Sequence, residues 1–126
     1  MSMKTELGKV RGLGSAHDGT GHFWMQRVTA IANVPLVLFL IYFMLAHVGA
    51  SRAGVVASIK NPFCAVALSL ALVSICWHMK LGLQMVIEDY VHGHASKLAA
   101  LLLNTFFAIG LCAVGVFAIL KISFGA

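Results

Sequence analysis

Residues 62–88 read PFCAVALSLALVSICWHMKLGLQMVIE, an apolar run in which Lys80 is the only internal formal charge. About 20 such residues are needed to cross about 30 Å of hydrocarbon as an α-helix. Two further apolar runs, at about residues 28–50 and 98–120, contain no formally charged residue. The sequence therefore predicts an all-α membrane protein with three transmembrane helices.

The composition agrees with this class. Of 126 residues, 60% are hydrophobic and only 10% are charged, whereas soluble domains carry about 25% charged residues. The net charge is +5, but the basic residues lie at the ends and in the loops, as expected for the flanks of membrane helices. This pattern favours membrane lipid as the surroundings and argues against nucleic-acid binding. Strands would require alternating polarity, which is not seen.

The connections predict the topology. A polar segment, residues 1–27, precedes the first helix, and two short loops, residues 51–61 and 89–97, follow the first and second helices. Short loops join antiparallel neighbours, so we expect one membrane-anchor domain, residues 1–126, folded as an up-down-up bundle. Pro35 is expected to kink the first helix, and Asn33 is a candidate partner for a freed carbonyl.

Basic residues favour a cytoplasmic N-terminus and a periplasmic C-terminus, because cytoplasmic flanks are enriched in Lys and Arg. The side predicted to be cytoplasmic carries Lys4, Lys9, Arg11, Arg27 and Lys97, and the opposite side carries Arg52, Lys60 and Lys121. No cleaved signal and no Arg-rich presequence is predicted at the N-terminus, which favours a bacterial source.

His78 is the unusual residue of the second helix. It lies about ten residues from the cytoplasmic end, roughly 15 Å deep, and ionisable groups at such depth are costly and usually functional. Two interpretations are open: a histidine hydrogen-bonded to a neighbouring helix, or an axial haem ligand. Gly82, one turn away, leaves room for a flat macrocycle or for close helix packing.

A second axial ligand is not expected from this chain. His47 is the other histidine inside an apolar run, but its depth differs from that of His78 by roughly 15–20 Å. If haem binds, the second ligand comes from another chain, in a hetero-oligomer or in a symmetric dimer.

Asp89 and Tyr90 close the second helix. Eleven helical steps return Asp89 to within about 20° of the face of His78, about 16 Å along the axis. The pair is either a helix end, with tyrosine in the aromatic belt, or a site for a lipid-soluble quinone. Arg27 and His22 are predicted to lie near the start of the first helix, on the same side of the membrane. Arg27 either anchors the helix or pairs with a haem propionate.

The sequence also resembles a known family. His78-x3-Gly82-x6-Asp89-Tyr90 and the stretch GTGHFWMQRVTAI, residues 19–31, resemble the membrane-anchor subunit of bacterial succinate dehydrogenase, the D subunit of respiratory complex II. The resemblance implies that a flavoprotein and an iron–sulfur subunit oxidise succinate. The two membrane subunits, this one and a C-type cytochrome b subunit, would bind haem b and ubiquinone in the bacterial inner membrane.

By this resemblance, His78 would be one axial ligand of haem b, and the C subunit would supply the other. Tyr90 would donate a hydrogen bond to ubiquinone, and Asp89 would support that site. Arg27 and His22 would lie near a haem propionate or the quinone.

Two alternative functions and the roles of several residues remain open at this level. The runner-up is the anchor of a fumarate reductase, and a different class is a cofactor-free three-helix structural or assembly protein. The sequence assigns no role to Lys80. Its ammonium group is expected to reach toward haem propionates, a carboxylate of a partner or the membrane interface, and the sequence does not choose among them. It also assigns no role to His17 or His92.

Overall fold

The computed structural model describes residues 5–12 and 18–125, which form helices joined by short turns. Lys4 and His17 lie outside these residues. The helices are α1 (Glu6–Val10), α2 (Asp18–Ala46), α3 (Arg52–Lys60), α4 (Pro62–Tyr90) and α5 (His94–Ser123). By length and apolar composition, α2, α4 and α5 qualify as membrane-spanning. The prediction of an all-α protein with three spanning helices is confirmed.

The predicted start and end of the first spanning helix were wrong. The helix was expected at residues 28–50, but α2 runs from Asp18 to Ala46. It begins earlier because some of the polar residues that follow Asp18 pack against α4. A prediction that uses only apolar length cannot detect such packing. It ends earlier because the chain turns at Gly49, whose φ of 77° favours glycine.

The second and third spanning helices extend beyond their predicted ends, residues 62–88 and 98–120. At the start of α4, Asn61 Oδ1 accepts a hydrogen bond from Phe63 N at 2.9 Å, and Pro62 occupies the first turn, where its missing N–H costs little. At the other end, α4 includes Asp89 and Tyr90. These two residues are therefore helical, not part of the predicted loop 89–97.

The predicted loop at residues 51–61 is mostly the helix α3. Ser51 caps it, because its side chain accepts a hydrogen bond from Gly54 N at 3.3 Å. α3 packs against both α4 and α5. It is also tied to the turn after α2, where His47 Nε2 lies 2.7 Å from Ser58 Oγ. A short capped helix therefore closes one end of the molecule.

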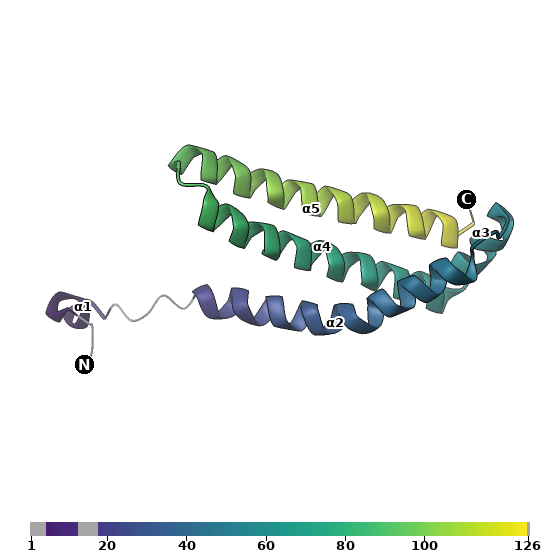
Figure 1. Ribbon diagram of the computed structural model, residues 1–126, viewed down its shortest axis with the longest axis horizontal. Helices are drawn as coiled ribbons and strands as arrows, with labels where there is room; N and C mark the ends of the chain where they lie inside the picture. Colours follow the sequence, from purple (N-terminus) through teal and green to yellow (C-terminus); the bar gives the residue numbers. More distant parts are fainter. Residues whose placement is uncertain (1–4, 13–17, 126) are drawn as a thin grey trace.

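The three long helices form an open layer with α4 in the middle (Figure 1). α4 packs against α2 on one side and α5 on the other, and within the described residues α2 and α5 do not contact each other. The up-down-up order is as predicted. We call the end of the layer that carries α3 the α3 end, and the opposite end, where α4 finishes, the Tyr90 end.

The interior of this layer is thin. The buried apolar residues are mostly on α4: Ala65, Leu68, Ala71, Cys76, Leu81 and, on α5, Ala108. α4 and α5 approach closely at Gly115, where an added Cβ would clash with Leu72 Cδ2. Large apolar side chains remain exposed along all three long helices, so lipid or other membrane helices must cover them.

Candidate functional site

One face of α2 is polar and lies against α4. His22, Gln26, Thr29 and Asn33 follow one another at spacings of four, three and four residues, which places them on one stripe of a helix. Thr29 is buried, with 7% of its surface exposed. This α2 stripe lies in the half of the helix toward the Tyr90 end.

The centre of the stripe holds His78. Thr29 Oγ1 lies 3.0 Å from His78 Nδ1 and 2.7 Å from the carbonyl oxygen of Met25. Two oxygens only 2.7 Å apart must share a hydrogen bond. Of these two groups, only the threonine hydroxyl carries a proton to donate. The hydroxyl therefore donates to Met25 O, and its oxygen accepts the hydrogen bond from His78 Nδ1–H.

This arrangement fixes the tautomer of His78. With the proton on Nδ1, Nε2 carries a free lone pair, which is the form of imidazole that binds metal. His78 Nε2 has no hydrogen-bond partner among residues 5–12 and 18–125. The bond to Thr29 is thus the kind of outer contact that orients a histidine ligand.

His47 contrasts with His78. Its Nδ1 donates to Phe43 O at 2.7 Å, and its Nε2 lies 2.7 Å from Ser58 Oγ. Both ring nitrogens are occupied, at the α3 end of the layer. The prediction that His47 cannot share an iron with His78 is consistent with this geometry.

Two further contacts join α2 to α4. Ser74 Oγ donates to Asn33 Oδ1 at 2.6 Å, so this oxygen pairs across the helix interface. Pro35 lies inside α2, and Figure 1 shows α2 bending near its middle, as predicted.

An added Cβ at Gly82 would meet only Gln26 Nε2, at 3.9 Å. Packing within this chain therefore does not require glycine at position 82.

Buried polar atoms without partners lie between His78 and the Tyr90 end. His22 Nε2 and Gln26 Oε1 are both buried and make no hydrogen bond with any described residue. Most buried polar groups are hydrogen-bonded, so an unpaired one calls for a water, an ion or a ligand. These two atoms belong to one stripe, one turn apart, so one polar group or a few waters would satisfy both.

The position of Arg27 differs from the prediction. It was expected where the first helix begins, on the same side of the membrane as Tyr90, but α2 starts at Asp18. Arg27 therefore lies within about 3 Å, along the axis, of the level of Thr29 and His78. It projects about 130° away from the centre of the α2 stripe. It is exposed, its guanidinium lies 5.1 Å from the centroid of the Phe23 ring, and it pairs with no described carboxylate.

Lys80 contacts its own helix. Its Nζ donates to Gln84 Oε1 at 3.2 Å and lies 5.6 Å from the centroid of the Trp77 ring. Gln84 Nε2 in turn donates to Glu88 Oε1 at 2.8 Å. A polar ladder thus runs from the level of His78 toward the Tyr90 end.

Asp89 and Tyr90 form the last residues of α4. Because α4 is helical from Pro62 to Tyr90, Asp89 shares the face of His78, as the spacing indicates. Both residues are exposed, Tyr90 with 78% of its surface. Neither makes a hydrogen bond or an ion pair with the described part of the chain, so both polar groups are free to meet a ligand or partner.

Sequence reasoning missed the roles of Thr29 and Gln26. The available signal was the spacing of polar residues from His22 to Asn33, which is that of a helical stripe. Within the described residues, no three His, Cys, Asp or Glu side chains gather as a metal site. A haem needs only one histidine from each side, so His78 fits it without such a cluster.

Comparison with known proteins agrees with this architecture. Residues 1–117 match the family model described as succinate dehydrogenase/fumarate reductase transmembrane subunit. The succinate dehydrogenase hydrophobic membrane anchor subunit of Rickettsia bellii is 36% identical over 88 residues, 70% of each chain. That of Paracoccus denitrificans is 31% identical over 117 residues, covering 93% of this chain and 90% of the relative.

A third relative, the succinate dehydrogenase membrane anchor subunit of Reclinomonas americana, is 29% identical over 95 residues, covering 73% of this chain and 79% of its own. No solved structure matches the chain. The family match covers nearly the whole chain, and the relatives share its length. The chain therefore belongs to the family of succinate dehydrogenase/fumarate reductase transmembrane subunits.

Proposed function

We propose that this membrane anchor subunit holds haem b through His78 Nε2 and forms part of a ubiquinone site with Tyr90 and Asp89. The observation that carries the haem assignment is the 3.0 Å contact between Thr29 Oγ1 and His78 Nδ1. It leaves Nε2 as the unprotonated nitrogen, which is the atom a ligand histidine presents to iron. A cofactor-free structural protein gives no reason for this bond to leave Nε2 unpaired.

The surroundings of His78 fit a flat cofactor. Gly82 has space beside it that packing within this chain does not need. Toward the Tyr90 end, His22 Nε2 and Gln26 Oε1 lack partners, and Arg27 lies near the same level on the outer side of α2. His22 is thus the residue of this face that would meet a propionate, whereas Arg27, which projects away from the α2 stripe, would meet one only from the other side of α2. Haem b, when bound, would supply a one-electron carrier within the membrane.

The quinone assignment depends on Tyr90 and Asp89. Twelve helical residues separate Tyr90 from His78, about 18 Å along the axis. Tyr90 would donate its phenolic hydrogen to a quinone carbonyl, and Asp89 would orient the ring or a nearby cation. Exposure of Tyr90 at the end of α4 leaves its hydroxyl accessible both to a lipid-soluble molecule and to a docked soluble subunit.

The rest of the assembly is proposed from the family to which the chain belongs. A flavoprotein and an iron–sulfur subunit would oxidise succinate and deliver electrons at the Tyr90 end, and a C-type cytochrome b subunit would supply the second haem ligand. The Tyr90 end would face the cytoplasm of a bacterium, with the C-terminus in the periplasm. The family description includes fumarate reductase, so comparing succinate oxidation with fumarate reduction by the purified complex decides the direction.

The haem proposal is tested by the visible spectrum of the purified complex. Wild-type complex should show a reducible b-type Soret and α band. His78→Gln should lower the haem content per complex, whereas His47→Gln, which changes the histidine at the opposite end, should not. Succinate oxidation with an artificial acceptor reports that each variant complex is assembled. An unchanged spectrum in His78→Gln rejects the ligand assignment.

The quinone proposal is tested with the two tyrosines of the chain. Tyr90→Phe removes one hydrogen bond, and a loss of about 1 kcal/mol predicts about five-fold weaker quinone reductase activity. Succinate oxidation with an artificial acceptor should persist. Tyr42→Phe, on α2 toward the α3 end, is the matched control. Equal quinone reductase activity in Tyr90→Phe and Tyr42→Phe would reject a role for the Tyr90 hydroxyl.

A further inference from the structure

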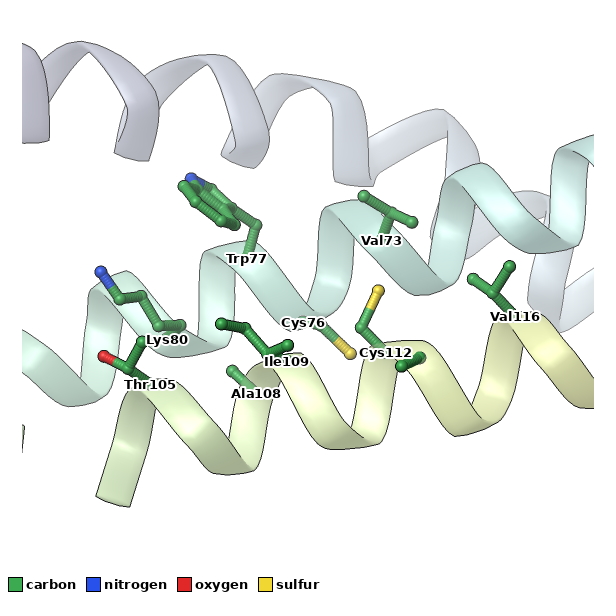
Figure 2. Close-up of a pocket in the computed structure, with 10 residues that line it drawn as sticks. Val73, Cys76, Trp77, Lys80, Thr105, Ala108, Ile109, Cys112 and Val116 are labelled. Atoms are coloured by element: carbon green, nitrogen blue, oxygen red, sulfur yellow. The ribbon is translucent and has the colours of Figure 1, made fainter. Parts of the chain in front are cut away.

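A long groove follows the seam between α4 and α5. It has two sections that share Val73 and Val116. The section at the α3 end has a volume of about 410 Å³ and runs from Pro62 and Phe124 to these valines. The second section, about 470 Å³, continues to Lys80, and Figure 2 shows its lining.

The section at the α3 end has the depth of one lipid leaflet. On α4 its lining residues recur every three to four positions from Pro62 to Val73, so they form one face of the helix. Eleven residues at 1.5 Å per residue give about 16 Å. Half of a hydrocarbon core about 30 Å thick is about 15 Å. An acyl chain of the nearer leaflet therefore matches this section in length and in its apolar lining.

A cation lies at the mouth of this section. Lys60 Nζ is 4.0 Å from where a Cβ on Gly125 would be, and Gly125 follows the groove residue Phe124. Arg52, at the start of α3, and Lys121, in the last turn of α5, belong to the same end.

This cationic end carries no Asp or Glu residue. The four acidic residues of the chain are Glu6, Asp18, Glu88 and Asp89. None of them belongs to α3, to its flanking turns or to the half of each long helix next to it. The positive charge at the α3 end is thus not neutralised by an Asp or Glu side chain of this chain.

We propose that the groove at the α3 end binds an anionic phospholipid, with one acyl chain between α4 and α5 and the phosphate on Lys60. This binding site is independent of the proposed haem and quinone roles. An acyl chain ends at mid-membrane and places a phosphate at the membrane surface, where the ammonium lies. A covering helix of a partner subunit would need no cation at the mouth of the groove.

The test uses the purified membrane complex containing this chain, reconstituted in phosphatidylcholine vesicles. A small fraction of the lipid is phosphatidylglycerol or phosphatidylcholine with a photoreactive diazirine near the end of one acyl chain. After illumination, mass spectrometry maps the labelled residues. We expect labels on the α4 and α5 residues of the section, with phosphatidylglycerol at least five-fold above phosphatidylcholine. A five-fold ratio of labelling corresponds to about 1 kcal/mol, which is what one lysine contributes near anionic headgroups.

Two variants separate the headgroup from the groove. Lys60→Gln should lower the phosphatidylglycerol preference about five-fold, and Lys97→Gln, a lysine at the Tyr90 end, should leave it unchanged. Ser69→Phe, which fills the groove, should lower labelling by both lipids, whereas Ala118→Phe, which lies on α5 off the groove, should not.

Any one of three outcomes overturns the proposal. Equal labelling by both lipids in the wild-type complex shows that the headgroup is not recognised. Absence of label from the groove in the intact complex shows that a partner helix covers it. A preference that survives Lys60→Gln removes Lys60 as the phosphate ligand and so contradicts the proposal as stated.

Discussion

Replacing Thr29 by valine tests the tautomer argument directly. Valine keeps the shape of threonine but lacks the oxygen that accepts the hydrogen bond from His78 Nδ1–H at 3.0 Å. Thr29 is buried, so water does not readily replace that oxygen. His78 then loses the contact that holds its proton on Nδ1 and fixes the direction of its ring.

The expected magnitude follows from comparable contacts. Loss of an outer-shell partner of a ligating histidine typically weakens metal affinity 10–100-fold, and an unpaired buried donor costs about 1–3 kcal/mol. We therefore expect Thr29→Val to weaken haem retention by about 10–100-fold and to change its reduction potential. The assays are haem content per complex during dilution, and a redox titration followed at the α band.

Two controls give this experiment its specificity. Thr29→Ser keeps the oxygen and should retain haem. Thr105→Val removes a threonine hydroxyl that donates a hydrogen bond within its own helix, to Leu101 O, and should have no effect on haem. If Thr29→Val keeps wild-type haem affinity and potential, the hydrogen bond does not position His78. If wild-type complex lacks haem altogether, the proposed function fails instead.

Two further predictions concern helix packing. Ser74→Ala leaves Asn33 Oδ1 without its partner at 2.6 Å. Because interhelical hydrogen bonds in membranes average about 0.6 kcal/mol, we expect a small drop in the thermal unfolding midpoint of the complex. An unchanged midpoint would contradict this expectation. Gly115→Ala should destabilise by about 1–3 kcal/mol because the new Cβ meets Leu72, whereas Gly110→Ala, with nothing within 4 Å, should not. Adding Leu72→Ala to Gly115→Ala should relieve the clash, and failure to do so would place the strain elsewhere.

Apolar length alone located the spanning helices. The runs that predict α2, α4 and α5 are long enough to cross a bilayer, and the membrane acts on each segment without reference to its neighbours. For the same reason His78 stood out within residues 62–88, because an ionisable side chain in an apolar run is conspicuous before any fold is known.

Helix boundaries were less predictable because they depend on more than apolarity. α2 begins at Asp18 although its first ten residues are largely polar, since part of that stretch packs against α4. α3 forms because Ser51 caps it and because it closes the end of the layer against α4 and α5. Arg27 was consequently expected at the start of the first helix, but it lies nine residues inside α2, near the level of His78.

The sequence by itself determined that this protein has three membrane-spanning helices, that His78 lies deep in the second, and that Asp89 and Tyr90 stand at its end. Periodicity is a property of a single helix, so the shared face of His78 and Asp89 needed no tertiary information. Only the tertiary structure decided that α4 lies between α2 and α5, and that Thr29 contacts His78. Such contacts depend on how far one helix slides and turns against another, and many different side-chain pairs along the two helices are compatible with the same hydrophobic pattern.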